Sequence, residues 1–195
     1  MELNLAGKVA MVAASSKGLG FGIARELARE GARVSIGART GSEVLDAAEA
    51  IKEETGAKVL SNVLDASDPD SIHKWLENTL DAFGDVHMLV VNAGGPPAGG
   101  FDDFEDADWQ AAFELTLTSA VRMIRAVLPP MRAAGEGAIL TVTSVSVKEP
   151  IEVLLLSNVM RSGVTSLAKS LSKQLAPDNI RINNLMPGRI DTDRV

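Results

Sequence analysis

A glycine-rich turn between a buried strand and a helix constrains the fold of this chain more than any other stretch. The apolar run Val9-Ala10-Met11-Val12 precedes Ala13-Ala14-Ser15-Ser16-Lys17-Gly18-Leu19-Gly20, and a helical pattern follows with Ile23, Leu27 and Ala28 on one face. Glycine permits a tight turn and a close approach of the backbone, and the free N–H groups at a helix N-terminus favour a phosphate. Taken alone, such a turn can also be a plain tight connection. A strand, turn and helix in this order favour an anion site.

The rest of the chain alternates apolar strands with amphipathic helices. Strand patterns lie at 8–14, 33–36, 58–64, 87–91, 138–143 and 180–185, and helical patterns lie at 20–30, 40–55, 68–83, 107–131 and 153–176. This alternation predicts an α/β fold, in which a parallel, doubly wound Rossmann-type sheet of order 3-2-1-4-5-6 carries helices on both faces. No linker or low-complexity tract interrupts residues 1–195, so we expect a single dinucleotide-binding domain.

Local signals mark several helix ends. Thr40-Gly41-Ser42-Glu43 resembles a capping box, Asp68-Pro69 is typical of a helix start, and Asp106 is expected to cap the helix that follows an acidic loop. Pro129-Pro130 predicts a bend near the end of that helix.

Composition excludes several classes of function. The formal net charge of −7 argues against a nucleic-acid binder, and the absence of cysteine excludes disulfides and thiolate metal sites. No carboxylates have metal-ligand spacing; His73 and His87 are expected to be structural, and Trp75 and Trp109 to anchor packing. The N-terminus has no signal-peptide pattern and no apolar run reaches membrane-spanning length, so we expect a cytoplasmic protein with no membrane partner.

Polar or glycine-rich segments follow four of the predicted strands. They are the first glycine turn, the loop that begins at Asn92, the residue Ser144, and Pro187-Gly188. Because ligands of such sheets bind beyond the carboxyl ends of the strands, these segments predict one common site.

These residues resemble the classical short-chain dehydrogenase/reductase family over essentially the whole chain. The resemblance implies a nicotinamide cofactor and hydride transfer to or from a carbonyl or alcohol, as in a 3-oxoacyl reductase, on a small-molecule substrate. The cofactor-binding residues that we expect are Ser15, Ser16, Lys17, Gly18, Leu19, Gly20, Arg39, Asp65, Asn92, Ala93, Gly94, Pro187, Gly188, Ile190 and Thr192.

The chain departs from the family pattern where catalysis is concerned. The family has a tyrosine thirteen residues after the serine and a lysine four residues later, whereas counting from Ser144 gives Ser157 and Arg161. The structural asparagine of the family falls on Thr116, and the chain contains no tyrosine at all. The family's first motif begins Thr-Gly where this chain has Ala13-Ala14, which is tolerable if the backbone φ stays negative.

The catalytic residues we expect are therefore not the usual ones. Ser144 is the candidate that hydrogen-bonds the carbonyl, and Arg161 the candidate clamp for ribose or substrate. Ser157 is too weak an acid to replace a phenol, although it could relay a proton through water. Arg161 is always protonated and cannot act as a base. Lys148 is a candidate acid if burial lowers its pKa; otherwise it is a solvated loop residue.

The region after the second strand favours NADP over NAD. NAD sites place an acid about twenty residues beyond the glycine turn, yet no acid lies between Gly31 and Ser42. Arg39 and Lys17 supply two cations that suit a 2′-phosphate, and Asp65 is expected at the adenine end.

Two further expectations concern the whole protein. Members of the family continue beyond the Pro187-Gly188 segment into a substrate-covering segment and a seventh strand. The chain is therefore expected to be a fragment, or else to lack that lid. The apolar stripes of 107–131 and 153–176 predict a homodimer or homotetramer, unless both stripes are core. A catalytically inactive dinucleotide-binding protein remains the alternative to the enzyme.

Overall fold

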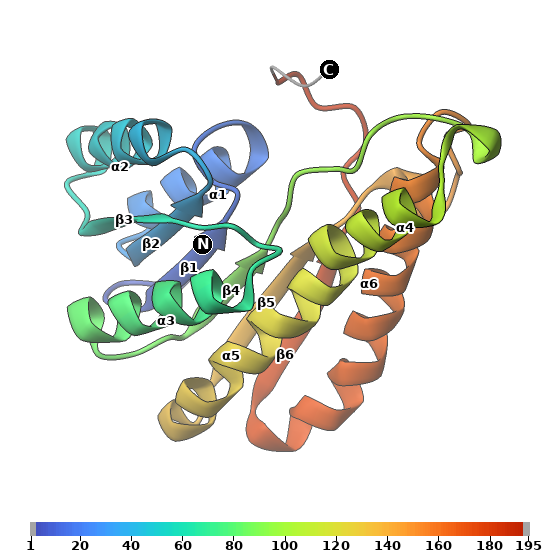
Figure 1. Ribbon diagram of the computed structural model, residues 1–195. Helices are drawn as coiled ribbons and strands as arrows, with labels where there is room; N and C mark the ends of the chain where they lie inside the picture. The colour runs from blue at the N-terminus through green and yellow to red at the C-terminus, as the bar shows by residue number, and fades with distance from the viewer. Residues whose placement is uncertain (1–2, 193–195) are drawn as a thin grey trace.

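The computed structural model describes residues 3–192, and within them the sheet has the predicted order. Six parallel strands are arranged β3-β2-β1-β4-β5-β6 (Figure 1), namely β1 (Val9–Ala13), β2 (Arg33–Ala38), β3 (Val59–Val63), β4 (Met88–Val91), β5 (Gly137–Val142) and β6 (Ile180–Leu185). The direction of winding reverses between β1 and β4. The carboxyl ends of these two strands therefore flank the crevice where folds of this class bind ligands.

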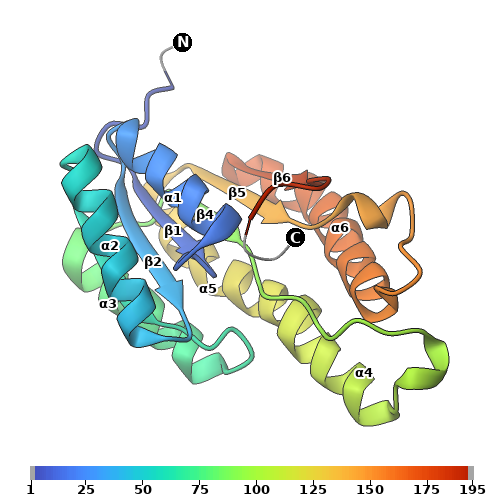
Figure 2. The same cartoon turned by 90° about the horizontal axis from the view of Figure 1, so that it is seen from above.

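The helices cover the two faces of the sheet in two groups (Figures 1 and 2). Helices α1 (Gly18–Arg29) and α2 (Gly41–Thr55) pack on one face around Val12, Ile36 and Ile51. Helices α3 (Pro69–Phe83), α5 (Ser119–Ala134) and α6 (Leu155–Leu175) pack on the other face. Among the described residues, no helix is long and apolar enough to cross a membrane.

The apolar stripes expected to drive self-association lie mainly in the core of this second face. Ala120, Ile124 and Val127 of α5 are buried, and so are Val164 and Ala168 of α6. The core between the sheet and helices α3, α5 and α6 therefore takes up most of both stripes, and self-association stays a prediction. Exposed large apolar side chains near these helices include Phe113, Val153 and Val159, at 40%, 58% and 45%.

The long helix expected at 107–131 is divided. Helix α4 (Asp106–Ala112) leads into a π-helical segment (Phe113–Thr118) and then into α5, which continues through Pro129 and Pro130 to Ala134. The irregularity thus lies at the π segment rather than at the prolines. There Gly163 of α6 leaves room for Leu117, whose Cδ2 would lie 2.9 Å from an added Cβ. Trp109 packs beside Met160 of α6.

Two of the three predicted caps are wrong. Asp68 does cap α3, and its carboxylate accepts the N–H of Asp70 at 2.9 Å. The side chain of Thr40 makes no capping hydrogen bond, although Thr40 is the N-cap of α2. Asp106 is the first residue of α4, and the N-cap of this helix is Glu105 instead. The N–H of Glu105 donates to the carboxylate of Asp108 at 2.9 Å.

The histidines and Trp75 serve the fold. The Nδ1 atom of His73 lies 2.8 Å from the carbonyl oxygen of Pro69, one turn earlier on α3. The N–H of Val9 donates to His87 Nδ1 at 3.1 Å, at the N-terminal edge of the sheet. Trp75 is buried in the core between the sheet and helices α3, α5 and α6, with 1% of its surface exposed.

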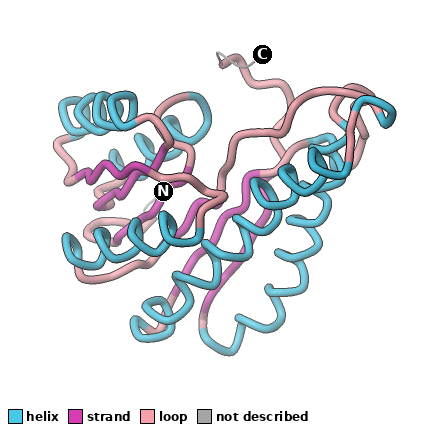
Figure 3. Tube along the Cα trace, viewed as in Figure 1, coloured by secondary structure: helices cyan, strands magenta, loops and turns pink. Residues whose placement is uncertain are grey.

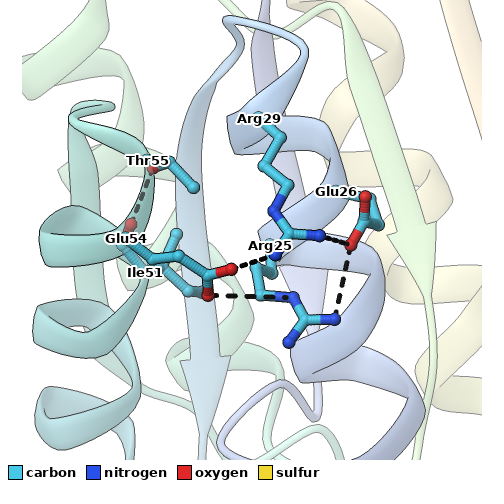
Figure 4. A network of polar contacts seen from close by, with 6 residues as sticks. All are labelled: Arg25, Glu26, Arg29, Ile51, Glu54 and Thr55. Carbon is cyan, nitrogen blue, oxygen red and sulfur yellow. Dashed lines mark hydrogen bonds and ion pairs between the residues drawn. The ribbon is translucent and has the colours of Figure 1, made fainter.

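A network of ion pairs joins α2 to α1 at the surface (Figure 4). Glu54 of α2 pairs with Arg25 and Arg29 of α1, and Glu26 pairs with the same two arginines. Because these side chains are between 35% and 57% exposed, solvent screens the pairs, and each contributes little to stability.

Candidate functional site

A cavity of about 570 Å³ opens where β1, β2 and β4 end. The loops after β4 and β6 run along this same edge of the sheet (Figure 3). Of the four segments predicted to form one site, the glycine turn and the loop that begins at Asn92 line this cavity, whereas Ser144 and Pro187-Gly188 do not. The predicted cofactor residues that line the cavity are Ser16, Lys17, Gly18, Leu19, Arg39, Asn92, Ala93, Gly94 and Thr192.

The N-terminus of α1 faces this cavity without a side-chain cap. Lys17 is the N-cap residue in extended conformation, its side chain makes no capping bond, and the first turn contains no acid. The free N–H groups and the positive end of the helix dipole are therefore available to an anion.

Gly20 permits the close contact between α1 and the turn. An added Cβ at this position would lie 2.2 Å from the carbonyl oxygen of Ala14, so no larger residue fits without moving the backbone. Gly20 is buried behind the residues that line the cavity.

The backbone of Ala14 contradicts the expectation of a negative φ. Its φ is +50°, in the left-handed region that favours glycine. The glycine of the family pattern adopts this backbone conformation without strain, whereas alanine does not. The carbonyl oxygen of Ala14 accepts a hydrogen bond from Asn92 Nδ2 at 3.3 Å, which ties the loop after β4 to the glycine turn. Asn92 thereby shapes the cavity as well as lining it.

The side chain of Ser15 points away from the cavity into the interior. Its Oγ donates to the carbonyl of Val12 at 2.7 Å and accepts the N–H of Gly37 at 3.1 Å. Ser15 is fully buried, and it joins the turn to β2. The hydroxyl of Ser15 therefore cannot make the cofactor contact that the sequence predicts for this residue.

Three charged side chains lie together at the β2 end of the cavity. Lys17 and Arg39 line it as predicted, and Glu43 from the first turn of α2 lines it with them. Glu43 Oε1 is 3.9 Å from Lys17 Nζ, and its Oε2 accepts from Ser16 Oγ at 3.4 Å.

Sequence reasoning missed Glu43 as a site residue. The sequence pattern predicts Glu43 as the partner of Thr40, three positions earlier, in a capping box. In the folded chain its carboxylate instead reaches back over the glycine turn. The signal in the sequence is the position of Glu43, which directly follows the acid-free segment between Gly31 and Ser42 where a ribose-binding carboxylate is expected.

Asp65 is held by its neighbour rather than aimed at the cavity. Its carboxylate accepts from the N–H of Ser67 at 2.9 Å and from Ser67 Oγ at 2.6 Å. These bonds lower the pKa of Asp65, and the charge of Arg39 lowers it further. Leu64 and Ala66, on either side of Asp65, line the cavity.

The segment after β6 returns to the glycine turn. The carbonyl of Pro187 accepts the N–H of Val145 at 2.9 Å, which joins this segment to the loop after β5. Gly188 and Ile190 follow outside the cavity wall, and the side chain of Thr192 lies 3.8 Å from where a Cβ of Gly18 would be. Thr192 therefore closes the cavity over the start of α1.

The predicted catalytic serine, Ser144, lies two residues after the end of β5 and is not among the residues that line the cavity. Ser144 Oγ accepts the N–H of Ser146 at 3.1 Å, which leaves its own proton free to donate. Ser144 is half-buried at the start of a short 3₁₀ turn, Val145–Val147. Its position suits a donor to a carbonyl oxygen.

Ser157 and Arg161 are buried under the end of β5, and neither lines the cavity. Arg161 Nε donates to Ser157 Oγ at 3.0 Å, one helical turn away. Its Nη1 donates to the carbonyls of Val142 and Thr143, at 3.1 Å and 3.3 Å. Arg161 thus fixes the backbone that leads directly into Ser144.

The hypothesis for Lys148 depended on burial, and the structure contradicts it. The side chain is exposed at the end of the 3₁₀ turn, so the burial that the hypothesis required is absent at Lys148. Thr116 is buried within the π segment, and its Oγ1 has no hydrogen-bond partner.

The comparisons with known proteins agree with this arrangement. Residues 8–195 match the short chain dehydrogenase family. Dehydrogenase/reductase SDR family member 4 from Homo sapiens is 33% identical over 189 residues, which are 96% of this chain and 68% of that protein.

The chain is also similar to solved structures of reductases. L-sorbose reductase from Gluconobacter frateurii, complexed with NADPH and L-sorbose, is similar with a TM-score of 0.97 and 34% identity, covering 100% of this chain and 74% of that one. A variant of the actinorhodin polyketide ketoreductase with NADPH has a TM-score of 0.91 and 28% identity, covering 96% and 72%. The parallel sheet, the glycine turn at its switch point and these matches show that the chain belongs to the short-chain dehydrogenase family.

Proposed function

We propose that this protein is an NADP(H)-dependent oxidoreductase that acts on a carbonyl or alcohol substrate. The observation that carries the proposal is the cavity in which the uncapped N-terminus of α1 stands beside Lys17 and Arg39. A dinucleotide diphosphate suits the free N–H groups, and a 2′-phosphate suits the two cations. The similarity to L-sorbose reductase and to the actinorhodin ketoreductase, both solved with NADPH, supports the same cofactor.

The residues of the chain have separable roles in this proposal. When bound, NADPH would supply the hydride for the carbonyl carbon, and the carbonyl oxygen would take its proton from solvent. Ser144 donates a hydrogen bond to the carbonyl oxygen, and Arg161 keeps Ser144 in place through the last carbonyls of β5. Arg161 is thus a positioning residue rather than the substrate clamp expected from sequence. A water relay through Ser157 remains a prediction.

Cofactor binding tests the proposal first. The pair Lys17→Ala, Arg39→Ala should weaken NADP⁺ binding by about ten- to a hundredfold, since two charged hydrogen-bond donors are lost. NAD⁺, which has no 2′-phosphate, should lose far less. The matched control removes two exposed cations that do not line the cavity, Lys52→Ala with Lys58→Ala. Equal affinity of the wild-type protein for both dinucleotides would refute the proposal.

Turnover tests the second part. We expect oxidation of NADPH with at least one member of a panel of 3-oxoacyl thioesters and ketoses, followed by nicotinamide absorbance. Ser144→Ala should lower kcat by at least tenfold, as expected when a donor to the developing oxyanion is lost. A Ser144→Ala enzyme with unchanged kcat would remove Ser144 from the mechanism.

A dinucleotide-binding protein without catalysis is the second candidate. The observation that favours it is that Ser157 and Arg161, which replace the tyrosine and lysine of the family, are engaged in structural bonds. Tight NADP⁺ binding with no turnover across the panel would favour this candidate. Ser157→Tyr with Arg161→Lys should not raise turnover, because the lysine cannot reproduce the bonds of the guanidinium.

We also propose that the protein self-associates as a homodimer or homotetramer, as its family membership suggests. Sedimentation equilibrium of the full-length protein measures the mass directly. A monomer at micromolar concentration would contradict this proposal, and it would leave the cofactor assignment intact.

A further inference from the structure

We propose that Glu43 moderates the preference of the cavity for NADP(H) by acting as a counter-ion to Lys17. In this role it weakens binding of a 2′-phosphorylated nucleotide and favours one with free ribose hydroxyls. The inference rests on the proposed NADP(H) function and adds to it a residue that opposes the preference of Lys17 and Arg39.

The geometry places Glu43 among the groups that would meet the 2′ position. Its carboxylate is held at both oxygens by the glycine turn, with Oε1 3.9 Å from Lys17 Nζ and Oε2 accepting from Ser16 Oγ at 3.4 Å. Glu43, Lys17, Ser16 and Arg39 all line the same cavity. The carboxylate therefore shares the ligand-facing surface with both cations.

The charges compete for the same partner. The two cations and the carboxylate together carry a charge of about +1, whereas a phosphate monoester carries about −1.5 to −2 near neutral pH. A 2′-phosphate must attract Lys17 away from Glu43 and then lie near a like charge. A free 2′-hydroxyl, by contrast, can donate a hydrogen bond to the carboxylate.

Exposure limits the size of the effect. The side chains of Lys17 and Glu43 are 66% and 49% exposed, so the pair is screened by water and by salt. Glu43 accordingly adjusts the preference for NADP and does not reverse it, because Arg39 and Lys17 remain in place.

A purely structural role for Glu43 makes a different prediction. An acid in the first turn of α2 interacts favourably with the helix dipole, and its loss would lower stability slightly. That role changes the melting temperature, and it affects the binding of both dinucleotides equally. The ratio of the two affinities therefore separates the two roles.

The experiment is equilibrium binding of NADP⁺ and NAD⁺ to wild type and to Glu43→Gln. Glutamine keeps the size of the side chain and removes its charge. We expect Glu43→Gln to bind NADP⁺ about two- to fivefold more tightly, with NAD⁺ affinity unchanged or lower. The gain should shrink at high ionic strength. Glu49→Gln, the same charge change on an exposed part of α2 outside the cavity, should leave the ratio unchanged.

A second variant guards against a folding defect. Glu43→Asp retracts the charge by one methylene group and should shift the NADP⁺ to NAD⁺ ratio in the same direction, by less. In a Lys17→Gln background the gain from Glu43→Gln should be smaller, because the competition for Lys17 is gone.

The outcomes separate this inference from the function on which it rests. Wild type that binds neither dinucleotide refutes the proposed function and the inference together. Wild type that prefers NADP⁺, with Glu43→Gln changing both affinities equally or matching Glu49→Gln, refutes the inference alone.

Discussion

Single residues determine the shape of the turn that follows β1. Ala14 takes a φ of +50°, which costs an L-amino acid about 1–2 kcal/mol. The backbone holds this conformation because the carbonyl of Ala14 lies under Gly20 and accepts the amide of Asn92. Ser15, the next residue, is fixed by two hydrogen bonds to neighbouring strands. The turn is thus strained at one residue and secured at the next.

Replacing Ala14 with glycine should therefore stabilise the protein. We expect Ala14→Gly to raise the free energy of unfolding by about 0.5–1 kcal/mol, since relief of the strain exceeds the entropy cost of glycine. Urea unfolding measures the change. Ala13→Gly is the matched control, because Ala13 is buried and its φ is not positive, and it should destabilise. A loss of stability in Ala14→Gly comparable to that of the control would contradict the strain.

At the scale of elements, α1 is positioned by its contact with the turn. The helix approaches so closely that only glycine fits at position 20, whereas an added Cβ at Gly22 meets nothing within 4 Å. On the other side of the sheet, Gly163 allows α6 to approach the π segment at Leu117. Helix packing in this fold therefore depends on the absence of side chains at a few places.

The two glycines of α1 offer a matched pair of substitutions. Gly20→Ala should lower the free energy of unfolding by about 2–4 kcal/mol, because the backbone of the turn must move. Gly22→Ala should raise it by about 0.5–1 kcal/mol through helix propensity. Thermal or urea unfolding measures both. If the two alanines have the same effect, the close approach is not a constraint.

On the scale of the whole molecule, the two edges of the sheet differ in character. The carboxyl edge holds the cavity and its cations. The opposite edge holds His87, whose pKa is lowered by partial burial first and by the charges of Lys8 and Arg33, against Asp85 and Glu136. Neutral His87 accepts the N–H of Val9, a bond that protonation removes.

Acid should therefore destabilise the fold through His87. The unfolded chain binds a proton near the ordinary histidine value of about 6.5, and the folded chain binds it only at lower pH. The contribution is fully present above about pH 6.5 and is lost as the pH falls through the folded value. Urea unfolding between about pH 7.5 and about pH 5 should show a shallower slope in His87→Asn than in wild type. Identical slopes would exclude His87 as the group responsible.

Local patterns in the sequence determined the order of strands and helices, the sheet topology and the position of the cavity. Strand and helix periodicities are properties of short segments, and the handedness of parallel crossovers leaves few ways to arrange them. The glycine turn is local for the same reason. Lys17 and Arg39 could therefore be predicted to lie beside the turn and the end of β2.

Only the tertiary structure decided where individual side chains point. The sequence placed Ser15 in the site, whereas the bond to Gly37, twenty-two residues away, turns its hydroxyl inward. Glu43 was expected to cap its own helix and instead reaches Lys17. Arg161 was expected at a ligand and instead holds the carbonyls of β5. Each outcome depends on contacts between segments that lie far apart in the chain, and such contacts form only when the sheet and its helices have packed.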